Sequence, residues 1–81
     1  MNTAFVFTIT LLNEKFETEY KTVEGLYSDK VIAKNEAMAK INLQKSMWEG
    51  SYISKLGEGK VALIKPNGMS KVYQIKEMEI K

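Results

Sequence analysis

Apolar and polar residues alternate along the first segment of the chain. Phe5, Phe7, Ile9 and Leu11 occupy odd positions, and the even positions between them hold mainly threonine. A two-residue period of aromatic and β-branched side chains is typical of a strand with one buried face. Residues 4–12 are long enough for the apolar part of a signal peptide, but no lysine or arginine precedes them and no small-residue cleavage pattern follows. We therefore interpret the segment as a strand of a soluble, cytoplasmic protein with no membrane attachment.

A second alternating segment covers residues 16–22. A two-residue turn at Asn13-Glu14 would pair Leu11 with Phe16 and place both apolar sets on one face of a hairpin. We expect Gly25 to end this second strand.

A helical period follows in residues 31–48. Its apolar side chains fall on one broad side of a helix, and Ser28-Asp29 supplies an N-cap just before it. The pattern predicts a helix from about 29 to 48 that ends at Gly50. An alternative makes residues 30–34 a strand and begins a shorter helix near Asn35.

The last third of the chain predicts a second hairpin. Pro66-Asn67-Gly68 suits a three-residue loop, because proline presets the first turn position and glycine takes the left-handed one. That loop pairs Leu63 with Lys71 and Val61 with Tyr73. Beyond Ile75 the apolar residues change parity, which predicts a bulge near residues 76–77.

These elements predict an α+β fold, a two-layer sandwich with one helix packed on a four-stranded, mainly antiparallel sheet. The chain order is strand, strand, helix, strand, strand (ββαββ), within a single domain of residues 1–81. An apolar fraction of 44% and a charged fraction of 27% are ordinary for a globular domain. The pattern does not fix the strand order in the sheet.

Gly57-Glu58-Gly59-Lys60 resembles a phosphate-binding loop only superficially. Such a loop lies between a strand and a helix, and a serine or threonine follows its lysine. Here a strand follows, and Val61 comes after the lysine. We interpret the run as a turn.

The chain has no His and no Cys, and all twelve of its basic residues are lysine. The side chains most suited to proton transfer, thiolate attack and metal binding are therefore missing. We predict no catalytic residue, no metal site and no cofactor, and we expect a protein that is not an enzyme.

Protein binding is the function that this sequence favours. Ala62, Ile64 and Val72 are apolar on the hairpin face that should meet solvent, and Tyr27 and Tyr52 lie outside the strong core patterns. These five residues are the candidate partner-binding residues, for a protein partner of unknown identity or a homodimer. The residue usage, rich in Lys, Asn and Ile, suggests a phage or mobile-element accessory protein, including an inhibitor of a host enzyme.

Nucleic-acid binding is the alternative. Lys55, Lys60, Lys65 and Lys71 surround the predicted second hairpin and could contact phosphates. A net charge of +2 and the lack of arginine make this interface weak.

Overall fold

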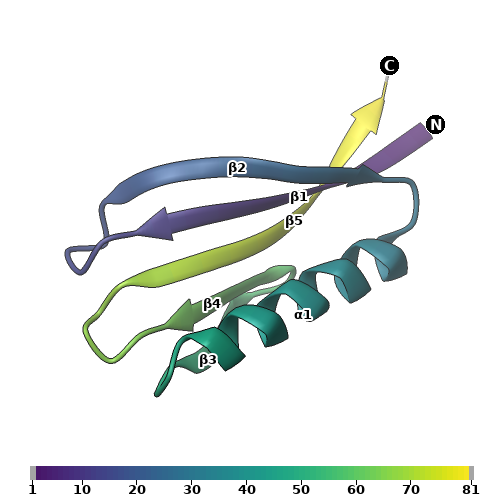
Figure 1. Ribbon diagram of the computed structural model, residues 1–81. Coiled ribbons are helices and arrows are strands. Elements are labelled where there is room, and N and C mark those ends of the chain that lie inside the picture. Colours follow the sequence, from purple (N-terminus) through teal and green to yellow (C-terminus); the bar gives the residue numbers. More distant parts are fainter. Residues whose placement is uncertain (1, 81) are drawn as a thin grey trace.

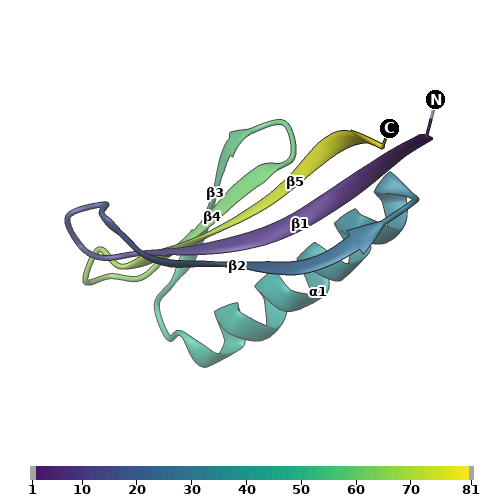
Figure 2. The same cartoon turned by 90° about the horizontal axis from the view of Figure 1, so that it is seen from above.

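The computed structural model describes residues 2–80 of the chain, and the side chains of residues 3–79. Its elements in chain order are β1 (Asn2–Leu12), β2 (Thr18–Tyr27), α1 (Lys30–Met47), β3 (Tyr52–Gly57), β4 (Lys60–Ile64) and β5 (Ser70–Ile80). The strands form one antiparallel sheet in the order β2-β1-β5-β4-β3, so the first and last strands pair at its centre (Figure 1). Helix α1 lies along one face of this sheet and leaves the other uncovered (Figure 2).

The α+β class and the single helix on an antiparallel sheet agree with the sequence pattern, but the count of four strands is wrong. The sheet has a fifth strand, β3, in the segment that the pattern left as a connection. Only Ser54 of this strand is partly buried, and the other five residues are exposed. An edge strand without a buried stripe has no apolar alternation by which the sequence could reveal it.

The core lies between α1 and the central strands. Phe7, Ile9 and Tyr73 from the sheet pack with Ala37 and Ile41 of the helix. The small alanines let α1 approach the sheet closely, and the rings of Phe7 and Tyr73 stack with centroids 6.3 Å apart. The odd positions of β1 therefore face the helix, as their alternation predicts.

The helix begins near residue 29, as the main prediction has it. Asp29 is its N-cap, and the Asp29 carboxylate accepts the backbone N–H of Val31 at 2.7 Å. Residues 30–34 are helical, so the alternative with a start near Asn35 is wrong.

The register predicted for the first hairpin is wrong. Leu11 pairs with Tyr20 rather than with Phe16. The Asn13 side-chain carbonyl accepts the backbone N–H groups of Lys15 and Glu17, each at 2.9 Å, which holds a longer loop than the expected two-residue turn. Phe16 adopts a φ of 63° in this loop and leaves 71% of its surface exposed.

Two other strand boundaries also differ from expectation. Gly25 does not end the second strand, because β2 continues to Tyr27, with a bulge where Phe7 pairs with Gly25 and Thr8 with Val23. No bulge occurs at residues 76–77, since β1 and β5 pair without a register shift. Met78 is half-exposed on the uncovered face. The change in apolar parity after Ile75 therefore comes from an exposed apolar residue and not from a bulge.

The second hairpin confirms its predicted loop. Leu63 pairs with Lys71 and Val61 with Tyr73. The Lys65 N–H donates to the Met69 carbonyl at 2.8 Å, and Gly68 has a φ of 97° that favours glycine. The run from Gly57 to Lys60 is a tight turn between β3 and β4, as predicted.

Candidate functional site

The uncovered face of the sheet is the largest surface that the fold leaves without a partner layer. Directly paired residues of an antiparallel sheet point to the same side. The register therefore assigns nineteen side chains to this surface, which we name the open face. They are Ala4, Val6, Thr8, Thr10, Leu12, Thr18, Lys21, Val23, Leu26, Tyr52, Ser54, Lys60, Ala62, Ile64, Ser70, Val72, Gln74, Lys76 and Met78.

Large apolar side chains protrude from both edges of the open face. On β2, Val23 and Leu26 are 67% and 68% exposed. Tyr52 on β3 and Met78 near the end of β5 are about half-exposed. Apolar side chains spread over one surface, and not packed by any other part of the described chain, are typical of an interaction surface.

The charged side chains that the register assigns to the open face are all lysines. Lys21, Lys60 and Lys76 lie on it, and no described side chain at a paired position of this face is a carboxylate. Lys21 and Lys60 line one hollow of about 290 Å³, whose floor includes Val72 and Thr10. The open face thus combines apolar contact area with positive charge.

The structure brings together four of the five candidate partner-binding residues. Tyr52 pairs with Ile64, and Ala62 pairs with Val72, all on the open face. Ala62 and Val72 keep only 3% and 7% of their surface exposed, so they form the floor of the face and not its contact points. Tyr27 lies on the opposite side of the sheet, half-buried against the core, and does not belong to this group.

The four candidate nucleic-acid lysines do not share a surface. Lys60 lies on the open face, whereas Lys55 lies on the helix side of β3. Lys65 and Lys71 place their ammonium groups 5.0 and 5.4 Å from the Trp48 ring centroid. Lys71 also donates to the Gln44 side-chain carbonyl at 2.7 Å. These last two lysines therefore cover a tryptophan at the end of α1.

Sequence reasoning named Tyr52 and Lys60 but missed the other large, exposed apolar and basic residues of the open face, which lie on β2 and β5. Lys21 and Val23 share a face with Lys60 only because β2, β1, β5 and β4 are neighbours in the sheet. The two-residue period could assign each residue to a side of its own strand, but the strand order was needed to combine them. Lys76 was not assigned to this face, because the change in apolar parity wrongly predicted a bulge at residues 76–77.

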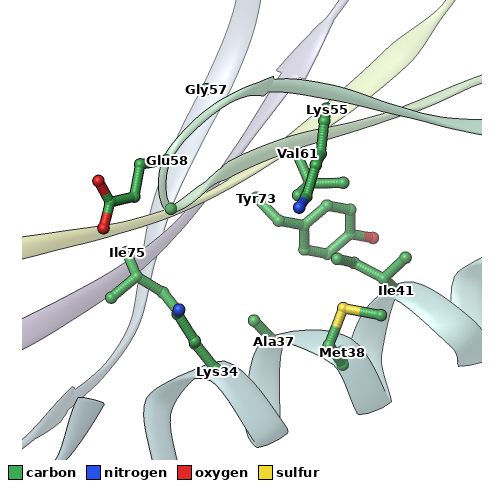
Figure 3. A pocket seen from close by; sticks show the side chains of 11 residues that line it. Lys34, Ala37, Met38, Ile41, Lys55, Gly57, Glu58, Val61, Tyr73 and Ile75 are labelled. Carbon is green, nitrogen blue, oxygen red and sulfur yellow. The ribbon is translucent and has the colours of Figure 1, made fainter. Parts of the chain in front are cut away.

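A second concavity lies on the helix side, between α1 and the β3-β4 hairpin. We name it the helix-side pocket; it has a volume of about 280 Å³. In Figure 3, Met38 and Lys34 rise from α1, Lys55 extends from β3 toward the helix, and the Tyr73 ring lies between the two layers. The pocket is lined by Lys34, Ala37, Met38, Ile41, Lys55, Gly57, Glu58, Gly59, Val61, Tyr73 and Ile75.

Two ionisable contacts connect the helix to the sheet. The Lys40 ammonium lies 2.9 Å from the Glu24 carboxylate, and this hydrogen bond lowers the pKa of Glu24 and raises the pKa of Lys40. At the other end of the helix, Lys30 lies 3.4 Å from the carboxylate of Glu58. Burial raises the pKa of Tyr73 to about 12, with a smaller contribution from the negative charge of Glu24.

The described residues bring together no group of three or more His, Cys, Asp or Glu side chains that could hold a metal ion. Within residues 2–80, no helix is long and apolar enough to cross a membrane. Comparison of the chain with protein-family models, with curated proteins and with solved structures found no match. The functional proposal therefore depends on the surfaces described above.

Proposed function

We propose that the protein is a small protein-binding module that presents the open face to an acidic surface of a partner protein. The observation that carries this proposal is the composition of that face, where exposed apolar side chains surround lysines and no paired position holds a carboxylate. Apolar side chains supply contact area, and the lysines select partners of opposite charge.

Nucleic acid fits the open face less well than protein. Binding of single strands relies on several aromatic side chains on which bases stack, and Tyr52 is the one described aromatic on this face. The chain also has no arginine with which to grip phosphates in a bidentate manner. The exposed aliphatic side chains of β2, Val23 and Leu26, match a protein interface better.

Two further expectations about partners remain predictions. The fold does not test a role as a phage accessory protein or as an inhibitor of a host enzyme. For a homodimer, face-to-face contact would bring the lysines of two open faces together, which disfavours pairing of two copies through this face.

The proposal is tested by affinity capture with the wild-type chain and with Lys60→Glu and Leu26→Asp variants. Lys45→Glu is a matched control, because Lys45 is an exposed lysine of α1 and lies away from the open face. We expect an acidic protein to be captured by the wild type and the control, and to be lost with both open-face variants. Circular dichroism of each variant establishes that the fold is retained.

Titrations with oligonucleotides test the alternative function, nucleic-acid binding. Labelled single-stranded and double-stranded oligonucleotides are titrated with the wild type between roughly 50 and 200 mM salt. We expect no binding that depends on Lys60. Oligonucleotide binding that weakens steeply with salt and with Lys60→Glu would contradict the proposal, as would capture of the same proteins by all variants.

A further inference from the structure

The two edge strands of the sheet differ in how well they are protected from further pairing. Strand β2 is interrupted by two bulges, and Glu17, Glu19 and Lys21 lie in it or next to it. Charges and bulges are the usual means of preventing an edge from pairing with another chain. Strand β3 has neither from Tyr52 to Ser54; its one charge is Lys55, and its one register shift follows that residue. Its Ile53 and Leu56 side chains are 40% and 51% exposed.

The helix-side pocket opens beside this less protected edge. Helix α1 packs on β1, β2 and β5, while Lys55 and Gly57 of β3 form one wall of the pocket. Alternate residues of a strand added outside β3 would point to the helix side. Such residues would lie at the mouth of a cavity whose other walls are the apolar side chains of Met38, Ile41 and Val61.

The rim of the pocket carries positive charge that has no ionic partner. Within residues 3–79, neither Lys34 nor Lys55 forms an ion pair. Glu58, the acidic residue of the lining, is paired with Lys30 instead. A side chain opposite Lys55 on the helix side would meet an ammonium group, which favours glutamate or aspartate there.

We propose that the β3 edge binds an extended acidic segment of a partner protein as a sixth, antiparallel strand. One apolar side chain of the segment fills the helix-side pocket, and carboxylates two positions away on the same face approach Lys34 and Lys55. Backbone hydrogen bonds to β3 give affinity, and the pocket and lysines give specificity. The inference shares with the proposed function that the partner is an acidic protein, but it uses a different surface.

A second copy of the chain is a poorer occupant of this edge. Strand β3 reads Tyr-Ile-Ser-Lys-Leu-Gly and contains no acidic residue. Antiparallel pairing of two β3 strands would bring two Lys55 side chains near each other without a compensating carboxylate. Charge therefore favours a heterologous segment.

The test uses two short synthetic peptides with threonine at alternate positions. In the first peptide, the positions between the threonines hold glutamate, leucine and glutamate, in that order. In the second peptide, lysine replaces both glutamates. Binding to the ¹⁵N-labelled chain is followed by NMR shifts and by amide hydrogen exchange. We expect the acidic peptide to bind, to shift residues of the helix-side pocket, and to slow exchange of the β3 amides that point outward. The lysine peptide should bind at least about fivefold more weakly.

Variants of the chain complete the test. Lys55→Glu should weaken binding of the acidic peptide by about fivefold and strengthen binding of the lysine peptide. Lys45→Glu should change the affinity for neither peptide by more than about twofold. Lys60→Glu on the open face should leave peptide binding intact, so this inference and the proposed function can fail independently. The inference is overturned if the acidic peptide does not bind, if the β3 amides stay unprotected, or if the shifts map to the open face. Equal affinity of both peptides also overturns it.

Discussion

Tyr73 is the residue at which the core and the helix-side pocket meet. Its ring stacks on Phe7, and the same side chain lines the pocket beneath β3. A phenol in this position keeps its proton because the anion would lose hydration on burial. The pKa of Tyr73 is accordingly raised to about 12, from an ordinary value of 10.

Tyr73 should make the protein less stable in strong alkali. In the unfolded chain the phenol ionises near its ordinary pKa of 10, whereas in the folded protein it stays neutral until about 12. The unfolded state therefore binds fewer protons between these values, and stability falls as pH rises from 10 toward 12. We expect Tyr73→Phe to lose less stability than the wild type over this interval, by up to about 2 kcal/mol. Urea unfolding at both pH values measures the difference, and equal losses would contradict it.

Ser51 carries the buried polar group that lacks a partner. Its hydroxyl oxygen accepts and donates no hydrogen bond to any described residue. A buried hydroxyl without a partner costs roughly 1–3 kcal/mol, so Ser51→Ala should raise the free energy of unfolding by about 1 kcal/mol. Chemical denaturation gives the value, and Ser28→Ala at an exposed position is the control. A destabilised Ser51→Ala variant would show that the hydroxyl is hydrogen-bonded after all.

At the scale of elements, the two loops that join paired strands show what sequence can and cannot predict. Pro66, Asn67 and Gly68 each have the backbone preference that their position needs, so the loop and its register were predictable. The first loop has Phe16 in the left-handed position, where glycine or asparagine is expected. Because phenylalanine does not favour the left-handed conformation, the sequence gives no sign of this loop. The register predicted for the first hairpin was therefore wrong.

The Phe16 position offers a simple gain in stability. A left-handed conformation costs a non-glycine residue about 1 kcal/mol, and the exposed Phe16 ring returns little packing energy. We expect Phe16→Gly to stabilise the protein by about 0.5–1 kcal/mol, measured as a shift of the urea midpoint with an unchanged slope. Phe16→Ala, which keeps the strain, serves as the control and should bring no such gain. Loss of stability with glycine would show that the ring makes contacts that matter.

The Glu24–Lys40 pair connects α1 to the edge strand β2, and it should affect how the free energy of unfolding changes at acidic pH. The folded-state pKa of Glu24 is lowered by its hydrogen bonds to Lys40 and Thr22, so its contribution is present above the ordinary value of 4.5. That contribution is lost as pH falls through the lowered pKa. Glu24→Gln should therefore destabilise the protein by under about 1 kcal/mol at neutral pH and by less near pH 2. Thermal unfolding at the two pH values measures this, and an equal effect at both would contradict it.

At the scale of the whole molecule, the candidate surfaces were only partly predictable. Ala62, Ile64 and Val72 share one face as predicted, because period two and one correct loop were enough to align β4 with β5. Tyr52 joins them only through β3, a strand that the sequence pattern did not predict. The fifth strand, the lysines of β2 and the helix-side pocket depend on strand order and on the exact path of α1. These are set by the summed packing of the chain and not by any local pattern.

The distribution of lysines should keep the protein monomeric. Both the open face and the β3 edge lack acidic side chains at their paired positions, so contact between identical surfaces would oppose like charges. We expect light scattering at low salt to give a mass near 9.2 kDa. If high salt produces a dimer, screening of these lysines is the cause, and Lys60→Glu should then promote the dimer at low salt. A stable dimer of the wild type at low salt would contradict the expectation.

The pairing of β1 with β5 at the centre of the sheet has a consequence for how the protein assembles. The two strands come from opposite ends of the described chain, yet they form the longest ladder of the fold, from Asn2 opposite Ile80 to Leu12 opposite Ser70. During synthesis, the hairpin of β1 and β2 must wait, with one side of β1 open, until the last strand has left the ribosome. Joining the strands then closes a long loop, from Leu12 to Ser70 at its shortest, and the entropic cost of this step slows folding. In the interval β1 is itself an edge strand, and a nascent chain stalled before β5 would expose this largely apolar strand to aggregation.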